Sequence, residues 1–423
     1  MGAIVKTLNG VALGWLWLSV LLMPILAIAG GLGFQAAGFF TGVSAILAWA
    51  VDRDGSRYLK TAWPLFLLGF VGWAWLSTLW SPYDGAILGG NASMLFGLCV
   101  ALLFLPFVVL KASPRMRNAL IWAVIVVGLL GVTILFIDAA SGFALSLWGD
   151  PVAAGDDPIQ RLSDAEMNLG RGQVSYVQLL WPVSALLIAR FKRGWILALA
   201  AFLGLMASAQ LNNLSVVIPT VILAGGFACI AWVKPSFGIK LAFAFAIAGL
   251  VCAPLLGLVS SLVETDVMPQ MPLSWEHRVR MWAYSWELIQ QAPLFGHGFD
   301  SARVFDEMKF RAPDGRDITV MSMHPHNIGL QIWLETGLVG IIFAVAFLFA
   351  LLKTALKVCT GSARAFAVAG LLATIASSGA VTVGVWQHWW WALIVLAVSL
   401  TCLVPVAGKV QNAQNLGKHQ KNT

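Results

Sequence analysis

Charged residues are scarce in this chain, and their scarcity excludes most classes of soluble protein. Only 11% of the 423 residues are Asp, Glu, Lys or Arg, whereas 59% are hydrophobic. The mean hydropathy is correspondingly high, at +0.84. Ordinary soluble domains carry about 25% charged residues, because their surfaces face water. The composition therefore predicts a protein that crosses a membrane many times.

Cysteine is also rare, and the sequence has no pattern typical of a metal or nucleotide site. The five cysteines are odd in number, widely spaced and in or beside apolar runs: Cys99, Cys229, Cys252, Cys359 and Cys402. This arrangement predicts packing residues and no disulfide framework. His324-x-His326 alone supplies too few ligands for a metal site. We find no glycine-rich nucleotide loop, so we expect no metal and no cofactor.

Apolar runs long enough to cross a bilayer recur along the whole chain. A spanning helix needs about 20 mainly apolar residues, and twelve runs approach this length. They lie near 10–31, 34–51, 62–80, 91–110, 118–140, 173–189, 195–211, 214–232, 240–263, 327–352, 365–385 and 388–407. The sequence therefore predicts an all-α, polytopic membrane protein of about twelve spans, with both termini on one side.

The distribution of basic residues predicts the orientation. The loops after the second, fourth, sixth, eighth and tenth runs, with the two chain ends, hold 18 of the 26 basic residues. Only Asp52 and Asp54, of the 19 acidic residues, lie in these segments. Cytoplasmic loops of membrane proteins are enriched in Lys and Arg, so we expect these segments in the cytoplasm. The net charge of +7 is explained in this way, and we expect no nucleic-acid partner.

Two longer loops are predicted on the opposite face, and they define the domain boundaries. The smaller covers about 141–172 and is acidic, and the larger covers about 264–325. We divide the chain into nine spans over 1–263, the large loop over 264–325, three spans over 326–408 and a polar tail over 409–423. Within the large loop, Val279, Trp282, Trp286 and Ile289 recur with helical spacing. This spacing predicts an amphipathic helix over 275–291 that lies on the bundle.

Polar groups able to exchange a proton stand at the start of the tenth apolar run. His324 and His326 flank Pro325, and Asn327 follows. Proline is tolerated in a first helical turn, so we expect the helix to begin at Pro325 and His326 to lie in that turn. Pro325 is expected to hold the two rings on different faces. Histidines at a membrane interface are often ordinary polar residues, and that interpretation stays open.

Three arginines near the predicted outer face are suited to binding phosphate. Arg278 and Arg280 stand near the start of the amphipathic helix, and Arg171 precedes the sixth run. A guanidinium group binds phosphate oxygens bidentately and keeps its charge. The alternative is that Arg278 and Arg280 extend to the interface or pair with Glu276. Glu335 lies within the tenth run, where a carboxylate is costly unless it is paired or faces a cavity.

Three of these segments together resemble one known family. His326-Asn327, followed after nine residues by Gly337-x-x-Gly340, resembles the signature of bacterial O-antigen ligases. The family also contains O-antigen polymerases and O-linked protein oligosaccharyltransferases. Arg278-x-x-x-Trp282 followed by P-L-F-G-x-G at 293–298 is similar to the large loop of this family. The stretch N-L-G-R-G at 168–172 resembles its segment before the sixth span, although here a leucine and a glycine are interposed.

The resemblance implies a glycosyltransferase C-like enzyme of the bacterial inner membrane whose site faces the periplasm. Such an enzyme transfers a glycan from undecaprenyl diphosphate to lipid A–core, without a metal and with inversion. The catalytic roles carry over to His326, as general base, and to Arg278, which would hold the diphosphate. The substrate-binding roles carry over to Arg171, Arg280, His324 and Asn327. Whether His324 or His326 is the base stays open.

Two other functions within the family and one outside it are the alternatives to a ligase. A polymerase uses the same donor with a second lipid-linked glycan as acceptor, and a protein oligosaccharyltransferase uses a serine or threonine hydroxyl. The spacing between His326 and Gly340 favours a ligase. A lipid or solute transporter predicts charged residues in mid-span and two paired halves, whereas this sequence keeps nearly all its charge in loops.

Overall fold

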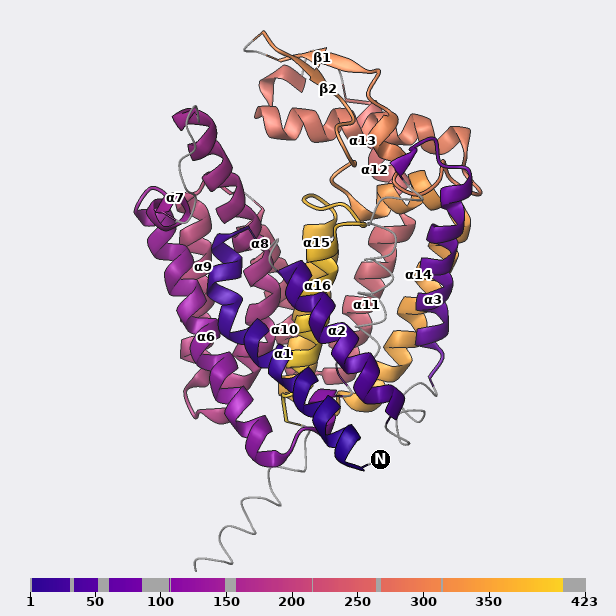
Figure 1. Ribbon diagram of the computed structural model, residues 1–423. Helices are drawn as coiled ribbons and strands as arrows, with labels where there is room; N and C mark the ends of the chain where they lie inside the picture. Colours follow the sequence, from indigo (N-terminus) through magenta and orange to yellow (C-terminus); the bar gives the residue numbers. More distant parts are fainter. Residues whose placement is uncertain are drawn as a thin grey trace, which may run out of the picture.

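Long helices run side by side through the body of the molecule, and a smaller segment covers one end of them (Figure 1). The computed structural model describes residues 2–30, 34–51, 61–85, 106, 108–148, 157–214, 216–263, 268–312 and 315–405. Its N-terminal half contains α1 (Gly2–Ile28), α2 (Phe34–Val51), α3 (Trp63–Leu76), η2 (Ser77–Leu79), α6 (Pro114–Ala140), α7 (Ala144–Trp148), α8 (Pro158–Arg190) and α9 (Gly194–Leu211). The predicted run at 91–110 lies almost wholly outside the described residues, and so does the tail from 409.

The C-terminal half continues the bundle and supplies the segment that covers it. The elements are α10 (Val217–Val233), α11 (Pro235–Val251), α12 (Ala253–Ser261), η3 (Met268–Gln270), α13 (Leu273–Gln291), η4 (Ser301–Val304), β1 (Lys309–Arg311), β2 (Asp317–Thr319), α14 (Ile328–Val358), α15 (Ser362–Gly379) and α16 (His388–Thr401). Strands β1 and β2 pair antiparallel, with Phe310 opposite Ile318. The all-α membrane class is confirmed, and this short hairpin is an addition that the sequence did not predict.

The number of spans stays a prediction. Among the described residues, five helices are long and apolar enough to cross a membrane, or up to six if α11 and α12 form one broken span. These two helices replace the single predicted span at 240–263, and they bend by 49° at their junction. Pro254 lies in the first turn of α12. Because proline lacks an N–H and crowds the preceding turn, it accounts for the break.

Helix α8 is the central element of the bundle, and it begins earlier than predicted. It contacts α1, α6, α9, α15 and α16, and nearly all its residues from Leu169 to Leu187 are buried. Its start is set by Asp157, whose side chain accepts the Ile159 N–H at 3.0 Å, with Pro158 at the first helical position. Such a cap is favourable for helix initiation. Residues 158–172, predicted as loop, are therefore helical.

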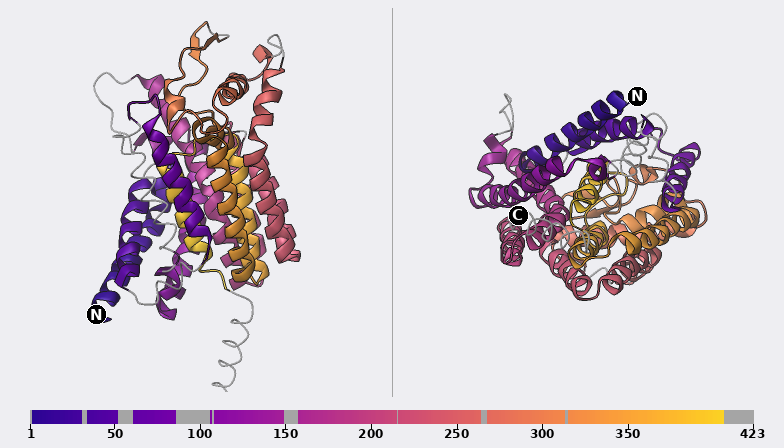
Figure 2. Two further views of the ribbon diagram at one scale, coloured as in Figure 1. Left: turned by 90° about the vertical axis from the view of Figure 1, so that its right-hand side faces the viewer. Right: turned by 90° about the horizontal axis from the view of Figure 1, so that it is seen from below.

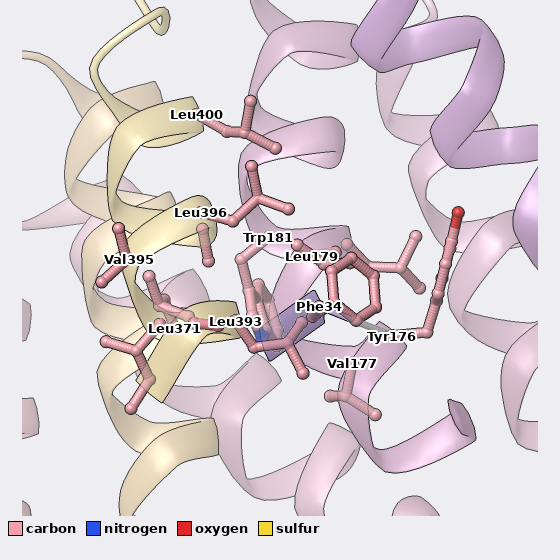
Figure 3. Close-up of a cluster of buried hydrophobic side chains, with 14 of the residues drawn as sticks. Phe34, Tyr176, Val177, Leu179, Trp181, Leu371, Leu393, Val395, Leu396 and Leu400 are labelled. Atoms are coloured by element: carbon pink, nitrogen blue, oxygen red, sulfur yellow. The ribbon is translucent and has the colours of Figure 1, made fainter. Parts of the chain in front are cut away.

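The core of the bundle is centred on Trp181 of α8. Its indole N–H donates to the Thr374 hydroxyl of α15 at 2.6 Å, and its ring lies 4.6 Å from that of Phe202. A Cβ at Gly370 would stand 2.3 Å from the indole, so only glycine fits there. Figure 3 shows the cluster, with leucines of α15 and α16 around the indole. This packing fixes α15 and α16 against α8, and so places the loop between α15 and α16.

Helix α13 and the β1–β2 hairpin lie together at the end of the bundle opposite the N-terminus (Figures 1 and 2). The predicted amphipathic helix at 275–291 is confirmed as α13, which spans Leu273–Gln291. It buries Met281, Trp282, Leu288 and Ile289 against α12, α14 and the hairpin segment. The candidate functional residues gather beneath it.

The orientation of this end of the molecule is tested by reporter fusions. We expect a fusion at Gly361 to report the cytoplasm, because it lies in one of the loops that hold most basic residues. Fusions at Asp157 and Asp314, in the two longer loops on the opposite face, should report the periplasm. Asp157 caps α8 and Gly361 precedes α15, whereas Asp314 lies outside the described residues. A cytoplasmic signal at Asp314 would contradict both the orientation and the periplasmic site.

Candidate functional site

The His-Pro-His segment at 324–326 lies between α13 and the loop that joins α15 to α16. The Trp282 indole N–H donates to the Pro325 carbonyl at 3.0 Å, which fixes the segment to α13. On the other side, a Cβ at Gly384 would stand 2.8 Å from the His324 ring. The segment is therefore held between two elements that are about 100 residues apart in the sequence.

His326 does not lie in a helical turn, which corrects the sequence prediction. Helix α14 begins at Ile328, and Asn327 is its N-cap, with the side-chain oxygen accepting the Leu330 N–H at 2.9 Å. His326 precedes the cap with φ of 51°, a left-handed conformation that Asn, Asp and His tolerate best. Asparagine is among the strongest N-capping residues and proline disfavours a helical conformation in the residue before it. The helix start therefore moves to the residue after Asn327.

One ring nitrogen of His326 is held by the backbone, and this sets the tautomer. The His326 Nδ1 lies 2.9 Å from the Thr382 carbonyl oxygen. A carbonyl can only accept, so Nδ1 carries the proton and Nε2 of the neutral ring carries a lone pair. Within the described part of the chain, no hydrogen bond occupies Nε2. His326 is therefore arranged as a proton acceptor.

His324 is held at both of its ring nitrogens. Its Nδ1 accepts the His326 N–H at 3.2 Å, and its Nε2 lies 3.0 Å from the Gln387 side-chain amide. The two imidazole centroids are 4.4 Å apart in an edge-to-face arrangement. The prediction that the rings lie on different faces is therefore wrong, because the left-handed backbone at His326 folds its ring back toward His324. His324 braces His326.

Both imidazoles are shifted toward the neutral form. Burial lowers the pKa of His326 to about 4, against the opposing effect of the Thr382 carbonyl and with help from the charges of Arg278 and Arg171. Burial, aided by His326 and by the charge of Arg303, lowers the pKa of His324 to about 3. A histidine can accept a proton only in its neutral form, and both rings are neutral near pH 7.

This shift predicts an unusual pH dependence for a reaction that uses His326 as base. The rate constant kcat/KM reports groups of the free enzyme, so it should stay level from about pH 8 to pH 5 and fall as the pH passes through about 4. An unshifted histidine would begin to lose its neutral form near pH 6.5. The measurement is initial transfer rate against pH, with activity regained on return to pH 7 as control. Half-loss near pH 6.5 would contradict a His326 base whose pKa is lowered by its surroundings.

Arg278 is anchored on the same loop as His326. Its Nε donates to the Val381 carbonyl at 2.9 Å and its Nη1 to the Ser274 carbonyl at 2.7 Å. Its guanidinium carbon lies 5.6 Å from the Trp275 ring centre. Among the described residues, Nη2 has no hydrogen-bond partner. Because Val381 and Thr382 are consecutive, their carbonyls hold Arg278 and His326 side by side. Burial lowers the pKa of Arg278, although a guanidinium group remains charged near neutrality.

The two other candidate arginines differ in their surroundings. Arg171 projects from α8 and bonds Asn168 Oδ1 at 3.2 Å, and its charge is near enough to lower the pKa of His326. Arg280 instead makes a salt bridge with Glu276 at 2.8 Å, and its guanidinium carbon lies 4.7 Å from the Phe310 ring centre. Arg171 therefore adds positive charge in the neighbourhood of His326 from a third element, whereas Arg280 links α13 to the hairpin.

The glycines of the sequence pattern shape the backbone next to the site. Gly337 interrupts α14 with φ of 62° and ψ of −164°. The Leu338 and Val339 N–H groups at this kink donate to the Pro293 and Leu294 carbonyls, at 2.9 and 3.2 Å. The turn at 293–298 therefore docks into the kink of α14. The spacing from His326 to Gly337 is therefore the length of α14 between the histidine segment and the place where this turn binds.

Replacing Gly337 with alanine should destabilise the fold. The backbone there is one that only glycine adopts readily, which costs about 1–3 kcal/mol for another residue, and a Cβ would stand 2.4 Å from the Leu294 carbonyl oxygen. Gly226→Ala in α10 is the matched control, because a Cβ there has no neighbour within 4 Å. The measurement is the thermal unfolding midpoint in detergent. Equal midpoints for the two variants would contradict the docking role.

The loop between α15 and α16 is the part of the site that the sequence did not indicate. Val381 and Thr382 contribute carbonyl oxygens, which every residue possesses, so residue identity gives no signal for this role. Gln387 and Gly384 were the available signs, since a polar residue and a glycine separate two apolar runs there. Among the described residues, no group of three or more His, Cys, Asp or Glu side chains gathers as a metal site would require.

Comparison with known proteins connects this geometry to a family. A family model described as O-antigen ligase matches residues 179–345, a range that includes Arg278, His326 and Gly337. A protein of Rickettsia bellii named "Putative polysaccharide ligase" is 25% identical over 77% of this chain and 78% of its own length. A protein of Rickettsia conorii named "Putative polysaccharide ligase RC0486" is 23% identical over 85% of this chain and 86% of its own length. No solved structure matches the chain significantly. Together with the all-α membrane bundle, the matched segment and the names of the relatives support the O-antigen ligase family and a glycosyl-transferring activity of the ligase or polymerase type.

Proposed function

We propose that this protein transfers a glycan from undecaprenyl diphosphate to a sugar hydroxyl of lipid A–core, on the periplasmic face of the bacterial inner membrane. The observation that carries the proposal is the pairing at Val381 and Thr382. Their adjacent carbonyls hold a cationic guanidinium and a neutral imidazole with its Nε2 lone pair available. The polysaccharide ligase names of the relatives support a ligase.

The neutral imidazole supplies the base for this transfer. In the proposed step, His326 Nε2 takes the proton of the acceptor hydroxyl while the oxygen of that hydroxyl attacks the anomeric carbon of the donor glycan. The bond from that carbon to the diphosphate oxygen breaks, and the diphosphate leaves with the electron pair. A single displacement of this kind inverts the anomeric configuration. The proton transfer contributes about 10²–10⁴-fold to the rate.

The arginines stabilise the charge that develops on the leaving group. Arg278 keeps Nη2 for phosphate oxygens while its Nε and Nη1 hold the backbone. Arg171, on α8, adds a second positive charge in the neighbourhood of His326. Preorganised donors aimed at developing negative charge are usually the largest catalytic contribution. In this proposal guanidinium groups supply the positive charge, and Arg280, paired with Glu276, serves the structure of α13.

Analysis of cell-envelope lipids in a deletion strain tests the reaction class. A ligase predicts that lipid A–core loses its long glycan while the lipid-linked glycan accumulates at full length. Loss of chain length, with single units still attached to the core, would identify a polymerase and contradict the proposal. A normal lipid profile with loss of glycan from a secreted protein would identify a protein oligosaccharyltransferase. Complementation with the intact gene is the control.

A further inference from the structure

Glu335 is a buried carboxylate in α14 that is surrounded by neutral donors. Its side chain has 0% exposure. Its Oε1 accepts the Gln331 side-chain N–H at 3.0 Å. Its Oε2 accepts the Asp300 backbone N–H at 2.8 Å and the Trp386 indole N–H. Among the described residues, no cation pairs with the Glu335 carboxylate. A carboxylate in such a place is costly and calls for an explanation.

The donors to Glu335 come from two segments that flank the proposed site. Asp300 belongs to the turn that follows α13, and Trp386 belongs to the loop between α15 and α16. Gln331, one turn before Glu335 on α14, extends the connection, because its side-chain oxygen accepts the Val385 N–H at 2.8 Å. Glu335 and Gln331 therefore hold two consecutive residues of the loop at 380–387.

That loop is also the one that holds His326 and Arg278. Thr382 accepts the His326 Nδ1–H, Val381 accepts the Arg278 Nε–H, and Gln387 faces His324. Gly384 lies between Thr382 and Gln387 in this loop. A Cβ at Gly384 would stand 2.8 Å from the His324 ring and 3.0 Å from the Gln331 side-chain oxygen, so there is no room for a side chain. The carbonyl that sets the tautomer of His326 thus belongs to a loop whose other end is bound to Glu335.

We propose that Glu335 is a positioning residue that acts on His326 through the 380–387 loop. The proposal rests on the role of His326 as base. Glu335 touches neither His326 nor the reacting atoms in this structure. Its carboxylate holds the loop in the one position where the Thr382 carbonyl meets Nδ1. A carboxylate suits the place because it offers only acceptors to three N–H donors.

Glu335→Gln tests this proposal, because it keeps the shape and replaces one acceptor by an N–H₂ group that faces donors. We expect kcat to fall about 10- to 100-fold, as misplacement of a catalytic group by about 1 Å does, with KM for the lipid donor unchanged. Glu287→Gln, on the exposed side of α13, is the matched control and should retain full activity. Trp386→Phe removes the indole donor, together with part of the buried ring that packs against Phe299, and should lower kcat several-fold. It is the second variant if Glu335→Gln does not fold.

Hydrogen exchange and a double variant separate positioning from a general loss of structure. Peptides covering 296–303 and 380–390 should exchange faster in Glu335→Gln and Trp386→Phe, while the other membrane helices exchange as in the wild type. In a His326→Asn background, adding Glu335→Gln should lower the residual rate by less than it lowers the wild-type rate, because the part of its effect that acts through His326 is already lost. Independent losses that multiply, or unchanged kcat in a folded Trp386→Phe and Glu335→Gln, would overturn the proposal.

The same experiments distinguish failure of this inference from failure of the proposed function. Full activity of His326→Asn alone would end the proposed mechanism, whatever Glu335 does. Reduced activity of His326→Asn combined with normal exchange at 380–390 in Glu335→Gln would leave the base in place and overturn only the positioning role.

Discussion

His326→Asn is expected to lose visible glycan transfer while the protein inserts and folds normally. The general base is removed, which typically lowers a rate by about 10²–10⁴-fold. Asparagine tolerates the left-handed backbone found at His326, so it is a better variant than alanine, which should show the same loss with added strain. The measurement is complementation of a deletion strain at matched expression, with the detergent-extracted protein checked by size-exclusion chromatography. Restoration of normal glycan by His326→Asn would contradict the role of base.

His324→Ala provides the comparison for this prediction. Neither ring nitrogen of His324 is available to a substrate, since Nδ1 accepts the His326 N–H and Nε2 lies beside the Gln387 side-chain amide. Its loss should therefore weaken transfer less than the loss of His326, because the ring braces its neighbour without exchanging a proton. A greater loss in His324→Ala than in His326→Asn would reverse the assignment of the base.

Arg278→Lys is expected to lose most activity although the positive charge is retained, with a fall of roughly 10²-fold. The fork of Arg278 holds the Val381 and Ser274 carbonyls and still presents Nη2. A lysine ammonium is a single point charge and cannot hold the loop and bind two phosphate oxygens together. The measurement is the transfer rate of the purified variant at saturating acceptor.

Arg311→Lys is the matched control for that experiment. Arg311 lies in the same segment of the chain and pairs with Asp317 at 3.0 Å, but its side chain is 69% exposed. Arg303, in the same segment, is unsuitable as a control. It pairs with the buried Asp300, and its charge lowers the pKa of His324. Near wild-type activity of Arg278→Lys, together with that of Arg311→Lys, would rule out the double role of Arg278 in holding the loop and binding the diphosphate.

The helices were predictable because membrane insertion depends on apolar length, which the sequence shows directly. Helix boundaries were less predictable, because they depend on capping. The sequence Asp157-Pro158 is a favourable helix start, yet the acidic surroundings favoured a loop, and the apolar pattern gave weight only to residues after 172. At Asn327 the same capping chemistry moved the start of α14 past His326. In both places a single side-chain hydrogen bond decides the boundary.

The site was partly predictable for a different reason. His326 and Arg278 carry distinctive side chains, so their spacing relative to Trp282 and Gly337 could suggest a common role. The structure adds how they meet, through the carbonyls of Val381 and Thr382. Backbone carbonyls leave no trace in residue identity, and the loop that bears them lies more than 50 residues after His326. The packing of α15 against α8, α10 and α11 brings that loop to the histidines.

The role of His326 as base is tested most directly by transfer in vitro with purified proteins. The assay compares wild type, His326→Asn and His324→Ala in single-turnover reactions with a lipid-diphosphate-linked glycan and lipid A–core. We expect His326→Asn to be slower by about 10²–10⁴-fold, with His324→Ala between it and the wild type and donor binding unchanged in both. A rate for His326→Asn equal to that of the wild type would contradict the proposed base.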